Sequence, residues 1–325
     1  MEDFNTGRIY LGLWASQGHA KKTPHKRESK IDKKSSIFVL YHIFRRYIYL
    51  STKKYNINMG YIGLFLTIAA VWYILSRVGA HIVFRPQKKR WPLKLPFQNV
   101  HIGPLTGIYL PAQGQQQPTL LFFHGRGGNV SHFENFAQAY APLGYGVLAF
   151  DYRGFGLSKG TPNQKHLEQD AVSAVTYALE NLHLLPQRLV IYGHSLGNAP
   201  ALFAALYFKD TPFKALILQS PFLSTPDMAA SWACGTYASH TWKYRLIRAL
   251  VTPFLWPNRF DNTRLCAGLT IPVLLCSSKA DQTLPWAQSA KLADAISHVQ
   301  RFLSPTGGHD EFAWAATAVD NFLKQ

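Results

Sequence analysis

The stretch Arg188-Leu-Val-Ile-Tyr-Gly-His-Ser195-Leu-Gly197 decides the fold. An apolar run leads into Gly-His-Ser-Leu-Gly, and a segment rich in alanine follows. Gly-x-Ser-x-Gly between a strand and a helix predicts a tight turn, the nucleophile elbow, in which the glycines relieve crowding around a strained serine. Such a turn exposes the serine oxygen at the helix N-terminus, where the helix dipole favours developing negative charge. The sequence therefore predicts Ser195 as a nucleophile.

A serine nucleophile needs a histidine as base and a carboxylate that orients the histidine. Asp281 fits the acid, because it follows the apolar run 272–277 in a loop. His309 fits the base, because it lies in the loop Pro-Thr-Gly-Gly-His-Asp before the last predicted helix. In folds that carry this elbow the order along the chain is Ser, acid, His, each after a strand. The three residues satisfy that order.

Each residue also has an ordinary structural explanation. Asp281 alone is compatible with a helix N-cap or a turn, and His309 is one of thirteen histidines in the chain. The agreement of all three positions with the ends of predicted strands favours the catalytic interpretation. Asp310 is a weaker candidate for the acid, because neighbouring loop residues rarely converge. His194 adjoins the serine and is expected to point away from its oxygen, so we interpret it as structural.

A second glycine-rich turn, residues 124–129, follows the first core strand. Such a turn can present a backbone N–H to an oxyanion, together with the N–H of the residue after the nucleophile. We assign these two donors to Arg126 and Leu196. A plain tight turn is the alternative, and the Arg126 side chain offers a further contact for an anionic substrate group. No Gly-Lys-Ser/Thr follows, which disfavours a phosphate loop.

From residue 100 onward, apolar runs alternate with segments of helical periodicity. This pattern predicts an α/β domain with a mostly parallel central sheet and helices on both faces. Residues 221–270 interrupt it with many aromatic residues and prolines, which predicts a small helical cap. The aromatic side chains of this cap either pack as core or line an acyl-binding pocket. Three cysteines are too few and too scattered for a disulfide scaffold or a zinc ribbon, and the predicted chemistry needs neither a metal nor a cofactor.

The net charge is distributed unevenly between the N-terminal segment and the rest of the chain. Hydrophobic residues make up 47% and charged residues 16%, which excludes a wholly disordered chain. Of the net charge of +17, residues 1–99 carry +14 and residues 100–325 only +3. The basic segment 1–58 is compatible with a nucleic-acid arm, but a solvated or membrane-adjacent tail is the simpler interpretation. A start at Met59 would remove this segment from the protein altogether. We expect no nucleic-acid partner.

Residues 61–84 predict a membrane anchor. Residues 61–76 contain no charge, and the whole stretch is long enough to cross about 30 Å of hydrocarbon. A secretory signal peptide, with Val-Gly-Ala at 78–80 as its cleavage site, and a buried helix are the alternatives. Basic residues flank both ends, so the full chain gives no clear orientation. A start at Met59 would favour a cytoplasmic catalytic domain.

Taken together, these motifs resemble the α/β-hydrolase superfamily. The similarity covers residues 100–325 and is strongest to the single-pass, membrane-anchored branch of lysophospholipase-like and protein-depalmitoylating serine hydrolases. Arg126 departs from the pattern, because relatives often carry a small or amide residue there. The motifs that carry the resemblance are His124-Gly, Asp151-Tyr-Arg-Gly-Phe-Gly-Leu-Ser, Gly193-His-Ser-Leu-Gly with Pro200, Ser220-Pro-Phe, Arg259-Phe-Asp, Asp281 with Pro285, and Gly308-His309.

The sequence thus predicts a membrane-anchored serine hydrolase that cleaves ester or thioester bonds through an acyl-enzyme. Its domains are the basic segment 1–58, the anchor 59–84 and a hydrolase domain 100–325 with the cap 221–270. Two other functions use the same fold. An aminopeptidase or amidase would need an acidic pocket for a free amino group, and Asp227 is the only aspartate before the Arg-Phe-Asp turn of the cap. A non-catalytic interaction protein would be expected to lack a triad residue, and none is missing.

Overall fold

The computed structural model describes residue 45, residues 59–114 and residues 116–325. Residues Thr67–Gln325 form one compact unit. The predictions made for the basic segment 1–58 lie outside the described residues, apart from Arg45.

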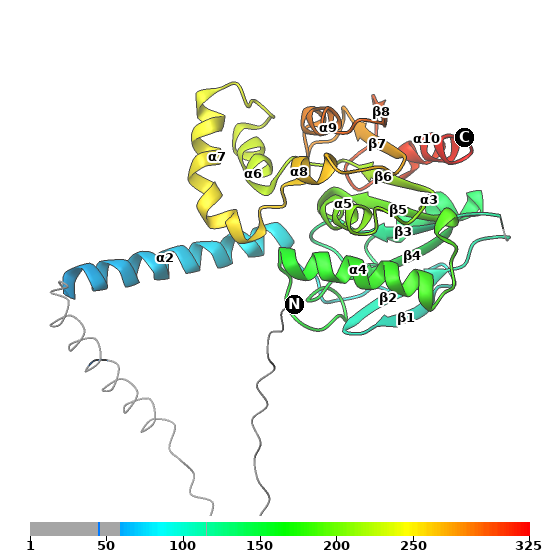
Figure 1. Ribbon diagram of the computed structural model, residues 1–325, viewed down its shortest axis with the longest axis horizontal. Coiled ribbons are helices and arrows are strands. Elements are labelled where there is room, and N and C mark those ends of the chain that lie inside the picture. The colour runs from blue at the N-terminus through cyan, green and yellow to red at the C-terminus, as the bar shows by residue number, and fades with distance from the viewer. Residues whose placement is uncertain (1–44, 46–58, 115) are drawn as a thin grey trace, which may run out of the picture. The chain divides into compact units, whose positions relative to one another are not determined.

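An eight-stranded sheet forms the centre of this unit (Figure 1). The strands are β1 (Gln98–Ile102), β2 (Leu105–Leu110), β3 (Thr119–Phe123), β4 (Gly146–Asp151), β5 (Leu189–His194), β6 (Ala215–Gln219), β7 (Val273–Ser278) and β8 (Val299–Ser304). Their order across the sheet is β1-β2-β4-β3-β5-β6-β7-β8. The strands β3 to β8 are all parallel to one another, while β2 is antiparallel to both of its neighbours, β1 and β4. The predicted α/β class with a mostly parallel sheet is confirmed.

Helices cover both faces of the sheet, which explains why the central strands are continuous apolar runs. Alternate residues of β3 enter different cores: Leu121 and Phe123 pack on one face, Leu120 and Phe122 on the other. The first face is covered by α4 (Gln164–Glu180), α5 (Asn198–Tyr207) and α9 (Trp286–Ala293). The second is covered by α3 (Glu134–Tyr140) and α10 (Ala313–Leu323). Short 3-10 turns η1 (Ala141–Leu143) and η2 (Pro186–Arg188) lead into β4 and β5.

The sequence did not place the first two strands. Only alternate residues of β1 are buried, because β1 lies at the edge of the sheet and pairs on one side only. Such a strand lacks the continuous apolar run that marked the later ones. The register joins Val100 to Gly107 and Gly107 to Phe150. A Cβ at Gly107 would lie 2.5 Å from the Ala149 carbonyl oxygen, so the close approach of β2 and β4 requires glycine there.

Helices also fill the stretch between β6 and β7, where the sequence predicts a cap. They are α6 (Thr225–Cys234), α7 (Trp242–Leu255), η4 (Trp256–Asn258) and α8 (Asn262–Cys266). The side chains of Ser224 and Thr241 accept hydrogen bonds from backbone N–H groups in the first turns of α6 and α7. These N-caps satisfy donors that have no partner within the helix, which defines where each helix begins.

Helix α2 (Met59–Phe84) is apolar and largely exposed. Within it, Gly60–Phe84 is the one described segment long and apolar enough to cross a membrane, judged by length and composition, and 6% of its most apolar window is buried. This exposure disfavours the buried-helix alternative. The end of the helix packs into the core through the buried side chains of Val83 and Phe84, and Ser76 and Gly79 before it are also buried.

Candidate active site

Ser195 lies at a sharp turn between β5 and α5. The turn is the 3-10 segment η3 (Ser195–Gly197), and Ser195 has a φ of +52°, a left-handed conformation that non-glycine residues rarely adopt. A Cβ at Gly193 would lie 2.6 Å from Asn198 Cα, and one at Gly197 would overlap the carbonyl of Phe123. Both glycines are therefore required for the chain to turn this tightly. The geometry is that of the predicted nucleophile elbow.

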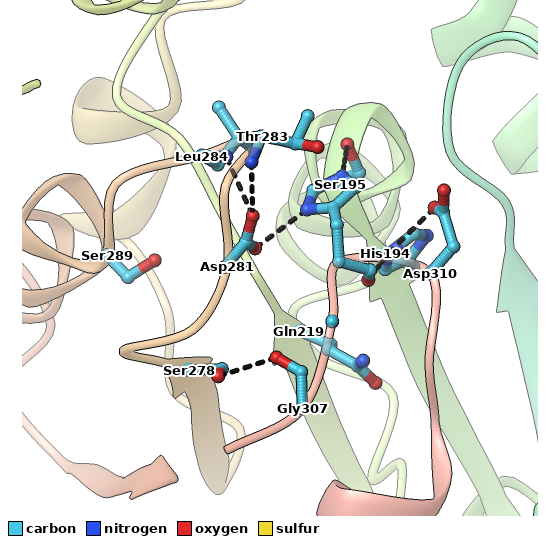
Figure 2. Close-up of polar contacts among 12 residues, drawn as sticks. His194, Ser195, Gln219, Ser278, Asp281, Thr283, Leu284, Ser289, Gly307 and Asp310 are labelled. Atoms are coloured by element: carbon cyan, nitrogen blue, oxygen red, sulfur yellow. Dashed lines mark hydrogen bonds and ion pairs between the residues drawn. The ribbon is translucent and has the colours of Figure 1, made fainter. Parts of the chain in front are cut away.

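His309 lies between β8 and α10, and both of its ring nitrogens have a partner. Nε2 lies 2.9 Å from Ser195 Oγ, and Nδ1 lies 2.7 Å from Asp281 Oδ2. The three residues, 86 and 28 positions apart along the chain, thus form one chain of hydrogen bonds. Figure 2 draws these hydrogen bonds, with the Asp281 carboxylate and the Ser195 hydroxyl on opposite sides of the imidazole ring.

The carboxylate of Asp281 is held by the loop after β7. The backbone N–H groups of Thr283 and Leu284 both donate to Asp281 Oδ1 at 2.8 Å, as Figure 2 shows. Burial alone would raise the pKa of this carboxyl group, but the hydrogen bond and charge of His309, with the Leu284 N–H, outweigh burial, and its pKa is lowered. Asp281 is therefore ionised at neutral pH and can stabilise a protonated His309. The loop of the base is tied to the same strand end, because Ser278 Oγ donates to the Gly307 carbonyl at 2.7 Å.

His194 and Asp310, the competing residues, lie outside this chain of hydrogen bonds. His194 Nε2 is 2.9 Å from the backbone carbonyl oxygen of His309, so the His194 ring holds in place the loop that carries His309. Asp310 does not contact the His309 ring through a described hydrogen bond. Its carboxylate is 3.8 Å from His194 Nε2 and its side chain is 70% exposed. The interpretation of His194 as structural agrees with this geometry.

The burial of His194 makes the stability of the folded protein depend on pH. Burial, reinforced by the nearby His309, lowers the pKa of His194 to about 3. The unfolded chain binds a proton at His194 near pH 6.5, whereas the folded protein does not until near pH 3. Stability is therefore lost as the pH falls from about 6.5, by up to about 1.4 kcal/mol per pH unit.

We accordingly expect the thermal unfolding midpoint to fall between pH 7 and pH 5, and to fall less in His194→Gln. This pH range lies above the titration of ordinary carboxyl groups, so they do not mask the effect. Scanning calorimetry of both proteins in the same detergent measures it. If the unfolding midpoints of the two proteins depended identically on pH, the protonation of His194 would not be the cause of the acid destabilisation.

The loop 124–129 lies directly against the serine. A Cβ added at Gly125 would lie 3.2 Å from Ser195 Cβ, and β3 is paired with β5 up to Phe123 and Gly193. The backbone of Arg126, the predicted first oxyanion donor, is therefore next to the turn that carries Leu196, the predicted second donor. The roles of these two N–H groups remain predictions.

The contacts that support this loop could not be predicted from the sequence. The last turn of α2 holds it twice: Arg126 Nη1 donates to the Ile82 carbonyl at 2.8 Å, and the Gly127 N–H donates to the Phe84 carbonyl at 3.1 Å. The Arg126 guanidinium also lies 4.5 Å above the ring of Trp232, on α6. These contacts join residues more than 40 positions apart, so no local sequence motif predicts them.

One trio of potential metal ligands occurs among the described residues, formed by His194, His309 and Asp310 with ligand atoms within 4.8 Å of one another. Both ring nitrogens of His309 already have partners in Ser195 and Asp281. A metal ion bound by His309 would have to break one of these hydrogen bonds. The trio therefore fits a serine-centred site better than a metal centre.

Comparison with known proteins agrees with this geometry. The family model for the alpha/beta hydrolase fold matches residues 118–234, which include β3 to α6 and the elbow. Uncharacterized protein Rv2307c of Mycobacterium tuberculosis is 30% identical over 209 residues, covering 64% of this chain and 68% of the relative. The chain belongs to the α/β-hydrolase superfamily. Its fold and its Ser-His-Asp arrangement identify it as a hydrolase of this superfamily.

Other relatives extend the similarity. Uncharacterized protein YfhR of Salmonella typhimurium is 29% identical over 76% of this chain and 86% of its own length. Lysophosphatidylserine lipase ABHD12 of Danio rerio is 31% identical over 63% of this chain and 57% of its own length. Among solved structures, the Pyrococcus furiosus esterase Pf2001 superimposes with a TM-score of 0.57 over 74% of this chain and 97% of the esterase, at 19% identity. At that identity the last match supports the fold alone.

Proposed function

We propose that this protein is a membrane-anchored serine hydrolase that cleaves ester or thioester bonds. The observation that carries the proposal is the continuous hydrogen-bonded chain from Ser195 through His309 to Asp281, with Ser195 at a strained elbow. A nucleophile, a base and an orienting acid in this order are what acyl transfer through a covalent intermediate requires. A relative named as a lysophosphatidylserine lipase supports ester bonds as the target.

In the proposed mechanism, Ser195 Oγ attacks the acyl carbon while His309 Nε2 accepts its proton. Asp281 keeps the imidazole in the tautomer with its proton on Nδ1 and stabilises the imidazolium that forms. The N–H groups of Arg126 and Leu196 hold the oxyanion of the tetrahedral intermediate, each worth about 3 kcal/mol of transition-state stabilisation. His309 returns the proton to the leaving alcohol or thiol. Water activated by His309 then hydrolyses the acyl-enzyme.

We further propose that α2 anchors the enzyme in a membrane. Its exposed apolar surface supports this role, because a helix that packed against the soluble domain along its length would be buried. An anchor confines the enzyme to the lipid surface, and acylated molecules in or near the bilayer are the substrates it meets there.

The aminopeptidase alternative finds little support in the cap. An acidic pocket for a free amino group needs an available carboxylate, but Asp227 is fully engaged. Arg248 Nε donates to Asp227 Oδ1 at 2.7 Å, Tyr244 Oη donates to the same oxygen at 3.1 Å, and the Ser224 hydroxyl binds Oδ2. This carboxylate stabilises the α6–α7 pair instead.

A panel of matched chromogenic substrates tests the bond type. We expect the full chain, purified in detergent, to hydrolyse p-nitrophenyl esters and the corresponding thioesters. Matched p-nitroanilides should react no faster with the wild type than with Ser195→Ala, because an amine is a poorer leaving group than an alcohol or thiol. Faster turnover of anilides carrying a free α-amino group would contradict the proposal and favour an aminopeptidase.

A further inference from the structure

An apolar groove lies between the C-terminal half of α2 and the helices α6 and α7. Its volume is about 460 Å³, within the range of ligand pockets, about 300–1,000 Å³. No charged side chain lines it, and Thr225 is its only polar side chain apart from the indole of Trp232. The residues that line it include Gly79 and Ile82 on α2, Met228, Ala229 and Trp232 on α6, and Val251 on α7. The hydrolytic mechanism uses none of them.

Specific contacts hold the walls of the groove in place. The indole N–H of Trp72 on α2 donates to the Pro253 carbonyl of α7 at 2.9 Å. A Cβ at Gly79 would lie 3.0 Å from Leu255 Cδ2, so the absence of a side chain at Gly79 lets α2 and α7 approach closely. The packing of α2, α6 and α7 against one another therefore forms the groove. Figure 1 labels these three helices.

Contacts of Arg126 and Thr283 link the groove to the candidate active site. Two lining residues, Ile82 and Trp232, are the partners of the Arg126 side chain: the Ile82 carbonyl accepts its hydrogen bond and the Trp232 ring lies under its guanidinium. The Trp232 indole N–H also donates to the Thr283 carbonyl at 2.7 Å, and the Thr283 N–H binds the carboxylate of Asp281. The same residues thus line the groove and contact the loops of the predicted oxyanion donor and acid.

We infer that this groove is the acyl-chain site of the enzyme and that its ligand is the long unbranched acyl chain of a lipid ester. The inference rests on the proposed function for the reaction itself. An almost wholly apolar lining cannot satisfy the polar groups of a peptide or a sugar, but it gains free energy from every methylene that it buries. One wall belongs to α2, the helix with the length and composition of a membrane span. A chain that lies along α2 in the bilayer therefore reaches the groove without crossing water.

Substitution of Ala229 by phenylalanine tests this assignment, because the new ring would fill the groove from α6. In the wild type, kcat/KM for p-nitrophenyl esters should rise by about fourfold per added methylene until the groove is full. Ala229→Phe should lower kcat/KM for the hexadecanoyl ester at least tenfold and leave the butanoyl ester within twofold. Ala233→Phe, at an exposed position of the same groove, provides a second variant if the first fails to fold. The matched control is Ala249→Phe, on the exposed face of α7 outside the groove.

A binding measurement separates this inference from the proposed reaction. Ser195→Ala protein is photolabelled with a hexadecanoyl ester that carries a diazirine in its chain, and the labelled peptides are identified by mass spectrometry. We expect labels on Met228 and Val251, and their loss when Ala229→Phe is added. Labelling of these residues without ester turnover by the wild type would retain the groove as a lipid site and refute the proposed reaction. Ester turnover with no label in the groove, or equal effects of Ala229→Phe on both chain lengths, would overturn the inference.

Discussion

Ser195→Ala is expected to lower kcat for ester hydrolysis by about 10⁶-fold, the size of effect seen when a triad serine is removed. The variant loses the only atom that forms the acyl-enzyme, so His309 has no proton to accept in the first step. The turn itself should persist, because its shape depends on Gly193 and Gly197, which stay in place. The loss should therefore appear in kcat with no change in the thermal unfolding midpoint.

Steady-state assays of the wild type, Ser195→Ala and Ser173→Ala measure this effect. Ser173 is exposed on α4, and its substitution should leave activity unchanged. Retention of more than a tenth of wild-type activity by Ser195→Ala would show that another group supplies the nucleophile.

The second large effect is expected for Asp281→Asn, about 10⁴-fold in kcat. An asparagine amide would offer a donor where His309 Nδ1–H needs an acceptor, so the imidazole would settle in the tautomer that cannot accept the Ser195 proton. The negative charge that stabilises the imidazolium would also be lost. The lowered pKa of Asp281 indicates that this charge is present throughout the neutral range.

Asp310→Asn is the matched control, because Asp310 neighbours the base in sequence but its carboxylate lies in solvent. We expect its kcat to stay within threefold of the wild type. Rates for both variants over pH 5–9, with circular dichroism to verify folding, separate the two aspartates. If Asp310→Asn lost as much activity as Asp281→Asn, Asp310 would be the orienting acid and the hydrogen bond to Asp281 would be structural.

Local patterns in the sequence were sufficient to predict the elbow and the parallel strands β3 to β8, but not β1 and β2. The run 188–197 predicts a buried strand, a tight turn and a helix, because each element satisfies its own backbone and packing needs within a few residues. Asp281 was placed by the same logic, since it follows the buried run of β7. His309 follows β8, an edge strand that is only partly apolar, so its place rested on the order of the motif as well. Their contact with each other and with Ser195 follows from the parallel sheet, which brings the C-terminal ends of β5, β7 and β8 to one edge.

The contacts that support the loop 124–129, which carries the predicted oxyanion donor Arg126, could not be predicted in this way. The hydrogen bond from Arg126 to the Ile82 carbonyl and the stacking of Arg126 on Trp232 depend on how α2 and α6 pack in three dimensions. Backbone carbonyls carry no sequence signal, and Trp232 was one aromatic among many in the cap. An acyl pocket lined by the cap was one of two interpretations of its aromatic residues and stays a prediction. No pattern in the sequence indicated that α2 forms a wall of the groove beside them.

In the proposed mechanism, His309 and Asp281 activate Ser195 as a nucleophile. Reaction of the purified full chain with a fluorophosphonate, followed by mass spectrometry of the modified peptides, tests it most directly. We expect one label on Ser195 in the wild type, none in Ser195→Ala and greatly slowed labelling in His309→Ala. The absence of a label at Ser195 in the folded wild type, or equally fast labelling of the wild type and His309→Ala, would contradict this mechanism.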